Sequence, residues 1–402
     1  MDLAGYSRAM RRLAILFALI AAPAVAAPPA TVAVVFDRTS VRTVLAEGFA
    51  DKASARAATA DDPVRIASVS KLVTALGVLR MVDAGQLDLD RDVSDYLGWR
   101  LRNPHFPDAP ITLRHLLSHQ ASLSDGGELY IIPLGMTLRE RLADPRMWDA
   151  AHPPGSGWFA YANINFPVAA SVMERASGQR FDRLMHRLVL RPLGLDACFN
   201  WGDGCSAKAV SRAAVLYRAT GEVARDDLSG QRPTCPVVVR DGQPCDLAHY
   251  VPGWNGALFS PQGGLRISMR DLARIGQMLA REGRGFLSPA SFAALTAPQW
   301  SAATGTGGIG EYGESTGFFC GYGLGLHRIG TPRPGCRDDL FGDGTLRIGH
   351  AGEAYGLRSG LWVDPATGKG LAFFTTQVPD DEPRGRSAFT RAEEAVVERA
   401  RR

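Results

Sequence analysis

The sequence has little of what a nucleic-acid-binding protein, a structural zinc protein or a membrane protein requires. Its formal net charge is only +4 over 402 residues, and the basic residues are scattered, whereas a nucleic-acid-binding protein concentrates them on one face. The six cysteines form no C-x-x-C pair and are irregularly spaced, which argues against a zinc site. Beyond the N-terminus, no apolar stretch approaches the ~20 residues that cross a bilayer. We therefore predict no nucleic-acid partner, no metal and no membrane span in the mature protein.

Lysine is scarce as well, since four of the 45 cationic residues are lysines. One of them closes Ser68-Val69-Ser70-Lys71, which has the form S-x-x-K and opens an apolar stretch of helical periodicity at 68–84. Ser68 and Lys71 would lie one turn apart on one helix face. Apolar neighbours favour the neutral form of Lys71, which can take the proton of a serine nucleophile. The alternative is a capping serine beside a lysine that extends to solvent, and the motif alone does not decide.

Two other motifs compete for a catalytic or cofactor role. Gly313–Gly317 has the form G-x-S-x-G around Ser315, and Gly305–Gly310 has the form G-x-G-x-x-G. Both motifs function between a strand and a helix, but the flanking sequence predicts a Gly-rich loop at 303–317. We interpret both matches as accidental and predict no cofactor.

Two further motifs follow in the chain. Residues 154–163 have the form PG-x(5)-Y-x-N, which includes Tyr161 and Asn163, and His350-Ala351-Gly352 is predicted to end a strand. Together with phrases at 65–90, 111–123, 191–199, 261–279 and 322–326, they resemble the serine β-lactamase and penicillin-binding-protein superfamily. The resemblance is to the branch of class C β-lactamases, D,D-carboxypeptidases and family VIII esterases, and it covers roughly residues 31–380.

The order of predicted elements agrees with this resemblance. Strands are predicted near both chain ends and helices mostly between them, which favours one antiparallel sheet shared by the two ends. We predict an α+β fold in which this sheet is flanked by helices and joined to an all-helical lobe. The sheet lobe would comprise about 27–84 and 254–402, and the helical lobe about 85–253. The predicted strands are 31–37, 41–49, 322–329, 344–350, 355–363 and 370–377, and the predicted helices are 68–84, 111–118, 164–190, 268–282 and 387–401.

The resemblance implies a role for each matched residue. Ser68 would be the acylated nucleophile, Lys71 would help to deprotonate it, and Tyr161 would be the partner base and later the proton shuttle to the leaving group. The backbone N–H groups of Ser68 and Glu353 would form an oxyanion hole. The residues expected to bind the substrate are Asn163, His350, Gly352 and Glu353.

Departures from the family pattern bear on the substrate. His350 stands where class C β-lactamases have the lysine of K-T-G, and a histidine is mostly neutral at pH 7. Glu353 would add a negative charge near the spot where a β-lactam carboxylate binds, although Arg358 could supply the missing cation. We therefore predict a hydrolase that acts on a small-molecule or peptide ester or amide. The alternatives are a class C-type β-lactamase, a D-alanyl-D-alanine carboxypeptidase, or a penicillin-binding sensor that is not an enzyme. The oligomeric state is not predicted.

The N-terminus has the pattern of a secretory signal. Three arginines at 8–12 precede the apolar run 13–22, and Ala24 and Ala26 are the small residues before a predicted cleavage site. We predict that residues 1–26 are removed and that the protein is periplasmic or secreted. Such compartments permit disulfides. Six cysteines allow 15 pairings, and among these we favour the three local ones, Cys198–Cys205, Cys235–Cys245 and Cys320–Cys336.

The remaining features are interpreted as structural. Residues 199–253 are rich in Gly, Pro and Cys, with one short helical run predicted near 210–217, and read as a surface insertion that could border a cleft. His115 and His119 have a spacing that could bind a metal, but no third ligand is nearby in the sequence.

Overall fold

Strands from both ends of the chain lie side by side near one edge of the main sheet. The computed structural model describes residues 28–311 and 313–402, so the predicted signal peptide lies outside the described residues. Thr31–Phe36 (β1) pairs antiparallel with Gly370–Thr375 (β17), as the sequence predicts. The order of the described sheet is β11 (Trp300–Ser301), β13 (Gly321–Tyr322), β14 (His327–Ile329), β15 (Arg347–Ala354), β16 (Leu357–Val363), β17, β1 and β2 (Val41–Glu47), with every neighbouring pair antiparallel.

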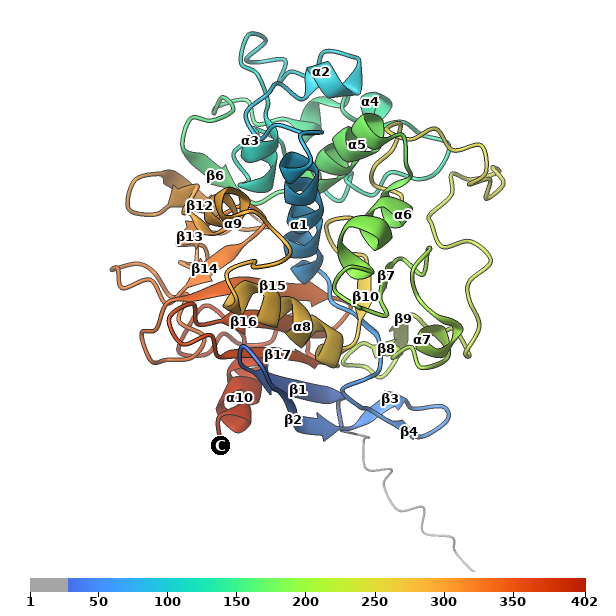
Figure 1. Ribbon diagram of the computed structural model, residues 1–402, viewed down its shortest axis with the longest axis vertical. Helices are drawn as coiled ribbons and strands as arrows, with labels where there is room; N and C mark the ends of the chain where they lie inside the picture. The colour runs from blue at the N-terminus through green and yellow to red at the C-terminus, as the bar shows by residue number, and fades with distance from the viewer. Residues whose placement is uncertain (1–27, 312) are drawn as a thin grey trace, which may run out of the picture.

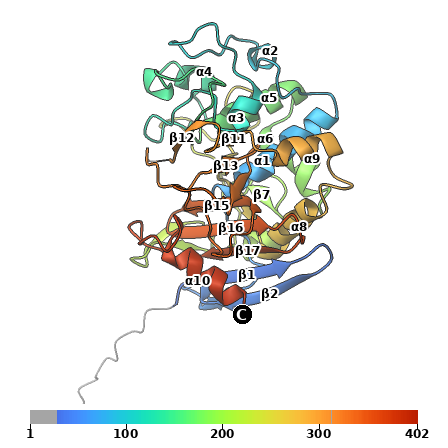
Figure 2. The same ribbon diagram turned by 90° about the vertical axis from the view of Figure 1, so that its left-hand side faces the viewer.

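Both faces of this sheet are buried. Alternate residues of β1 enter two separate apolar clusters: Val32 and Val34 pack in one with α8 (Met269–Ala280), and Ala33 packs in the other with α10 (Arg391–Ala400). The two helices cover opposite faces (Figures 1 and 2). A strand buried on both faces needs apolar residues at successive positions, which explains the unbroken run VAVVF in β1.

The remaining helices lie mostly above the sheet, with α1 (Val69–Asp83) between the two parts (Figure 1). Nearly every residue of α1 is buried, so its apolar character extends around the whole helix. The predicted assignment of residues to two lobes remains a prediction. The other helical elements are α2 (Ser94–Leu97), α3 (Leu113–Leu117), α4 (Leu138–Arg141), a 3-10 turn (Pro145–Met147), α5 (Asn165–Ser177), α6 (Phe181–Met185), a π turn (His186–Leu190), α7 (Ala207–Ser211) and α9 (Pro289–Thr296).

Short strand pairs complete the fold. Three short strands near α1 form a small sheet, in which Leu265–Ile267 (β10) lies between Val64–Arg65 (β5) and Cys198–Phe199 (β7). The others are β3 (Phe49–Asp51) with β4 (Arg56–Ala57), β8 (Leu216–Tyr217) with β9 (Val223–Arg225), and the parallel pair of β6 (Trp158–Ala160) with β12 (Thr306–Ile309).

Four predicted boundaries were wrong, each at a turn or a strand end. The stretch 164–190 is not one helix, because Gly178 adopts a left-handed conformation (φ +67°) that ends α5. The predicted strand 322–329 is divided by a turn at Gly325. The run at 210–217 is helical only to residue 211 and then enters β8. β15 continues to Ala354, so His350-Ala351-Gly352 lies within a strand and does not end it.

All three predicted disulfides are present: Cys198–Cys205, Cys235–Cys245 and Cys320–Cys336. Two of them close loops in the Gly- and Pro-rich segment that begins after β7. A search of the described helices for a long apolar membrane-crossing segment finds none.

Candidate active site

Ser68 stands at the start of α1, directly after a strained backbone position. Ala67 has φ +47°, which a residue with a side chain seldom adopts. Such strain persists where the surroundings fix it. Here Ile66 is held on two sides, because its N–H donates to Leu265 O at 3.1 Å and its carbonyl accepts from Ser359 Oγ at 2.9 Å. The chain therefore presents Ser68 between β10 and β16.

Lys71 is completely buried and contacts Ser68 one turn away. Its Nζ lies 2.9 Å from Ser68 Oγ, 2.6 Å from Asn163 Oδ1 and 3.1 Å from the carbonyl oxygen of Gln262. The alternative of a lysine that extends to solvent is therefore excluded. Burial lowers the pKa of Lys71 to about 7, against the opposing attraction of Glu311 and Asp125.

The three contacts can all be made by the neutral amine that the lowered pKa of Lys71 makes available near neutral pH. Asn163 Oδ1 and Gln262 O can only accept hydrogen bonds, so they use the two N–H groups of a neutral Lys71. The remaining lone pair then faces Ser68 Oγ, whose hydroxyl can donate to it. Asn163 is oriented by its other end, where Nδ2 donates to Asp125 at 3.0 Å and to Glu311 at 2.6 Å. The site thus has a geometry in which Lys71 can take the proton of Ser68.

Tyr161 lies beside this pair and is buried. Its ring centroid is 4.7 Å from Lys71 Nζ, and the ring of His119 stacks on it at 4.3 Å. Burial raises the pKa of Tyr161 well above its usual value, although a hydrogen bond with Ser68 opposes this. The protonated phenol is therefore favoured, which fits a proton donor better than the base that the family resemblance implied.

Two carboxylates of this site, those of Asp125 and Glu311, were not predicted from the sequence. Asp125 accepts hydrogen bonds from the backbone N–H groups of Asn163 and Ile164, each at 2.9 Å. Glu311 belongs to the loop whose motifs were interpreted as accidental. Burial raises the pKa of both carboxyl groups. The only local signal was the position of Glu311 directly after a Gly-rich run, which is too common to identify a site residue.

The strand β15 presents a free edge to Ser68. It pairs with β14 only from Arg347 to Gly349, whereas its pairing with β16 continues to Ala354. The edge from 350 to 354 therefore has no strand on the β14 side among the described residues. Gly352 allows close packing there, because an added Cβ would overlap Ile66 O and Ser359 Oγ. The glycine is thus required by the chain segment before Ser68.

His350 is neutral and is held by two hydrogen bonds. Its Nδ1 lies 2.5 Å from the Ala351 carbonyl, which can only accept, so Nδ1 carries the proton. Its Nε2 then accepts from the Tyr322 hydroxyl at 2.8 Å. Burial and the nearby Lys71 hold the pKa of His350 well below its usual value. This position therefore supplies no cation at neutral pH.

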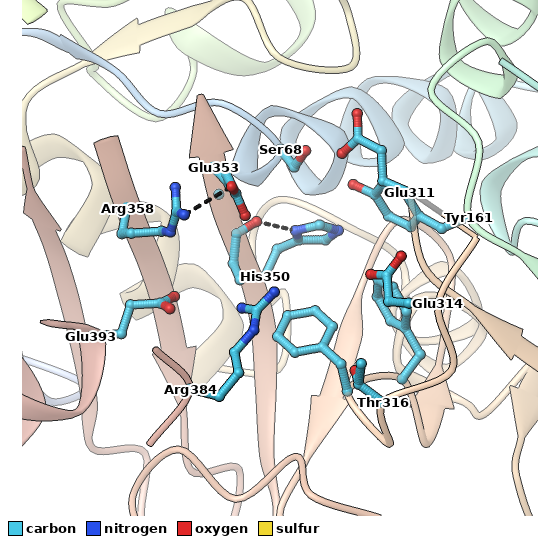
Figure 3. Close-up of a pocket in the computed structure, with 14 residues that line it drawn as sticks. Ser68, Tyr161, Glu311, Glu314, Thr316, His350, Glu353, Arg358, Arg384 and Glu393 are labelled. Atoms are coloured by element: carbon cyan, nitrogen blue, oxygen red, sulfur yellow. Dashed lines mark hydrogen bonds and ion pairs between the residues drawn. The ribbon is translucent and has the colours of Figure 1, made fainter. Parts of the chain in front are cut away.

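Glu353 forms an ion pair with Arg358, so the negative charge that was expected at this position is compensated. Arg358 Nη2 lies 2.8 Å from Glu353 Oε1, and Figure 3 shows the pair beside Ser68. The expectation that Glu353 repels a substrate carboxylate was therefore incomplete. Arg358 compensates that charge, and for the same reason it is not a free replacement for the missing lysine.

The rejected motifs do not bring Ser315 to Ser68, although its neighbours Glu314 and Thr316 line a pocket with Ser68. Ser315 lines a different cavity, against Trp300 and Cys336. Part of the predicted loop 303–317 forms β12, which pairs with β6. His119 accepts from the Ala162 N–H at 3.1 Å and so supports the segment that carries Tyr161. The described residues contain no group of three side chains placed to hold a metal ion.

Two pockets meet at Ser68. The first, here called the Tyr161 pocket, holds the phenol and His350 (Figure 3). The aromatic rings of Phe318 and Phe319 also line it. The second, here called the Asn163 pocket, lies on the other side, and Ser68, Glu311 and Glu353 line both. The other residues of the Tyr161 pocket are Glu314, Thr316, Ala351, Gly352, Arg358, Arg384 and Glu393.

Comparison with known proteins places this arrangement among related folds. The Beta-lactamase family model matches residues 17–395. Esterase EstB of Burkholderia gladioli is 35% identical over 38% of this chain and 42% of its own length. The D-alanyl-D-alanine-carboxypeptidase/endopeptidase AmpH of Escherichia coli K12 is 31% identical over 34% of this chain and 36% of its own. Both matches span less than half of the relative.

A solved structure extends the comparison to the fold as a whole. The octameric penicillin-binding protein homologue from Pyrococcus abyssi superposes with a TM-score of 0.64 and 20% identity, covering 92% of this chain and 72% of that one. At this identity the likeness concerns the fold alone.

Proposed function

The chain belongs to the Beta-lactamase family, and we propose that it is a serine hydrolase that cleaves an ester or amide bond through an acyl-enzyme on Ser68. The observation that carries the proposal is the environment of Lys71, a buried amine whose pKa is lowered to about 7 and whose Nζ lies 2.9 Å from Ser68 Oγ. A serine beside such a base is an activated nucleophile. The esterase and carboxypeptidase named among its relatives are consistent with this chemistry.

The proposed reaction uses each group once in each half. Neutral Lys71 takes the proton of Ser68 as the oxygen attacks the substrate carbonyl, and the backbone N–H groups of Ser68 and Glu353 stabilise the oxyanion. Tyr161 donates a proton to the leaving group, and Lys71 restores it. In deacylation the same steps run in reverse, with water in the place of the leaving group. Tyr161, having passed its own proton to Lys71, takes a proton from the water that attacks the acyl carbonyl. Lys71 then protonates Ser68 as the acid is released.

We propose that esters and small amides are better substrates than β-lactams. A β-lactam carboxylate is bound well by a permanent cation, and neutral His350 supplies none. Arg358 is already paired with Glu353. We expect kcat/KM for p-nitrophenyl butyrate to exceed that for nitrocefin. His350→Lys should then raise nitrocefin turnover, and a tenfold preference of the unaltered protein for nitrocefin would contradict the assignment.

The free edge of β15 supports a second candidate, a peptidase acting on D-alanyl-D-alanine peptides. A peptide backbone can add to an unpaired strand edge, and the edge from 350 to 354 lies beside Ser68. Release of D-alanine from a D-Ala-D-Ala peptide at a rate above that of butyrate ester hydrolysis would favour this candidate.

We further propose that the protein is exported. The three disulfides support an oxidising compartment, and so does the signal pattern at the N-terminus. Expression in a bacterial host should give a periplasmic or secreted protein whose first residue is Ala27. A cytoplasmic product that keeps its N-terminus would overturn this proposal.

The nucleophile is tested by labelling with a fluorophosphonate followed by peptide mapping. The label should fall on Ser68 and be absent from the Ser68→Ala variant, while Ser315→Ala should label normally. Ser68→Ala should still fold, because a serine at a helix start contributes only about 1 kcal/mol and this side chain makes no capping hydrogen bond. A label on Ser315, or persistent esterase activity in Ser68→Ala, would refute the proposed nucleophile.

A further inference from the structure

The Asn163 pocket contains a buried arginine that lacks a carboxylate partner. Arg65 lies three residues before Ser68, lines this pocket and is 8% exposed. Within the described residues its Nε has no hydrogen-bond partner, and its guanidinium makes one long hydrogen bond, from Nη2 to Ser260 Oγ at 3.4 Å. A buried charge without a counter-ion is strongly unfavourable. Binding of an anion by this guanidinium would therefore be stabilising.

The nearest buried carboxylate is already used. Arg266, which is paired across the strands with Arg65, holds Asp226 through Nη2 at 2.9 Å and Nε at 3.2 Å. One buried carboxylate thus stands against two buried guanidinium groups, and of the two only Arg266 contacts it, so the local charge is positive. Burial, together with repulsion from Arg266, lowers the pKa of Arg65 to about 10, so it stays charged at neutral pH.

Two more arginines line the same pocket. Arg218 and Arg225 are exposed and belong to the β8–β9 hairpin of the segment 199–253. The ring of Tyr355 lies 5.3 Å from the Arg65 guanidinium and 5.8 Å from that of Arg225, so it bridges the buried and exposed cations. The segment 199–253, predicted to be a surface insertion, therefore contributes two basic side chains, Arg218 and Arg225, to the Asn163 pocket.

The carboxylates of this pocket do not neutralise these arginines by direct contact. Asp125 and Glu311 are bound to Asn163 on the side of Lys71, and Glu353 is bound to Arg358. Glu128 and Asp380 are exposed at the rim. Among the described residues, none of these five lies within 4.0 Å of the Arg65, Arg218 or Arg225 guanidinium groups.

The two pockets assign the two halves of a substrate. The proposed proton donor Tyr161 lines only the first pocket, so the leaving group belongs there and the acyl group belongs in the Asn163 pocket. We propose that the acyl group carries a carboxylate, which Arg65, Arg218 and Arg225 bind. This inference rests on the proposed function, and it specifies the substrate class: an ester or amide of a dicarboxylic or similarly anionic acid.

Three p-nitrophenyl esters of equal acyl length test the charge preference. They are the monoanionic adipate, its neutral methyl ester and the cationic 6-aminohexanoate. We expect kcat/KM to fall in the order anionic, neutral, cationic, with the anionic ester preferred over the neutral one by about tenfold or more, as for a charge-assisted hydrogen bond. Added salt should reduce the preference. An equal rate for the anionic and neutral esters, or a preference for the cationic ester, would overturn the proposal.

Substitutions test which arginines cause the preference for the anionic ester. Arg225→Gln and Arg218→Gln, which are exposed and should fold, are each expected to reduce the anionic-to-neutral ratio several-fold, mainly through KM. Arg65→Gln should nearly abolish it. Arg284→Gln, an exposed arginine remote from the cleft, is the control and should keep the ratio. An unchanged anionic-to-neutral ratio in Arg218→Gln and Arg225→Gln would refute the proposal that these arginines bind the carboxylate, even if Arg65→Gln fails to fold.

The result is separable from that of the proposed function. If fluorophosphonate labels Ser68 and the neutral ester is hydrolysed, but the three esters show no charge preference, only the anion site is refuted. If Ser68 is not labelled and none of the three esters is hydrolysed, the proposed function fails first.

Discussion

Lys71 is the residue that should govern the pH dependence of the reaction. Its pKa of about 7 means that the neutral, basic form is populated above neutrality and lost below it. We therefore expect kcat/KM for a p-nitrophenyl ester to rise with pH through about 7. A flat profile between pH 5.5 and 8.5 would show that the amine does not act as the base.

Glu311 should tune this pH dependence. Its negative charge favours the protonated form of Lys71 and so raises the lysine pKa. Removing the charge with Glu311→Gln should therefore move the rising limb of the profile to lower pH, and Glu282→Gln, an exposed carboxylate elsewhere, should leave it in place. A movement to higher pH would mean that the sign of this interaction is wrong.

Lys71 and Tyr161 should behave as one catalytic unit. Both contact Ser68 and belong to the proton path proposed above. Lys71→Ala and Tyr161→Phe should each slow acylation by about 10²-fold or more, and the double variant should lose little beyond the worse single one. Pre-steady-state acylation rates measure this directly. Fully multiplicative losses would show that the two side chains act independently.

At the scale of elements, the approach of β15 to the start of α1 positions Ser68, the proposed nucleophile. Gly352→Ala would place a methyl group against Ile66 O and Ser359 Oγ. We expect a loss of about 1–3 kcal/mol in the free energy of unfolding, as for other overpacked sites, together with slower acylation because Ile66 precedes Ser68 by two residues. Thermal unfolding and labelling rates provide the measurements.

Another glycine of the same sheet provides the control for this substitution. In β13, the nearest atom to an added Cβ at Gly321 is Arg328 Cβ at 3.3 Å, which requires only a small adjustment. Gly321→Ala should therefore be milder in both measurements. Equal effects of the two substitutions would indicate a general intolerance of the sheet and no special role for the contact at Gly352.

Helices and strands were predicted well where their limits depend on neighbouring residues. They were predicted poorly where a segment distant in the chain determines where they end. Thr112 and Ser268 cap the helices at their predicted starts, and such a cap uses donors only three residues away. The end of β15 was misplaced because β16, not the local sequence, extends it to Ala354. The turn within 322–329 is fixed by Leu117 O, which accepts from Gly325 N–H across the molecule.

At the scale of the whole molecule, the disulfide Cys320–Cys336 connects stability to the site. It closes a loop with a sequence separation of 16, and Phe319 beside it stacks on Tyr161 at 5.0 Å between ring centroids. Replacing both cysteines by alanine should lower the free energy of unfolding by about 3 kcal/mol and also reduce kcat. Denaturant titration and ester turnover measure the two effects.

The disulfide Cys235–Cys245 offers a matched comparison, since it closes a shorter loop in the segment 199–253. Its removal should destabilise the protein without changing the Tyr161 environment. An equal loss of kcat in both double variants would argue against a specific connection between Cys320–Cys336 and Tyr161.

The sequence by itself determined the local relationships of this protein. Helical periodicity placed Ser68 and Lys71 one turn apart, and short spacing favoured the three disulfides that are present. Both depend on residues that are near each other in the chain. Motifs in a fixed order also indicated the superfamily, and the Beta-lactamase family model matches residues 17–395.

Only the tertiary structure decided how charge is distributed around Ser68. Glu311 reaches Asn163 across a separation of 148 residues, and Arg65 lacks a carboxylate because Arg266 holds Asp226. Burial of Lys71 and Tyr161 likewise depends on elements far away in the chain. A pKa is set by solvent exclusion and by charges a few ångströms away, and neither quantity is encoded in the neighbours along the sequence.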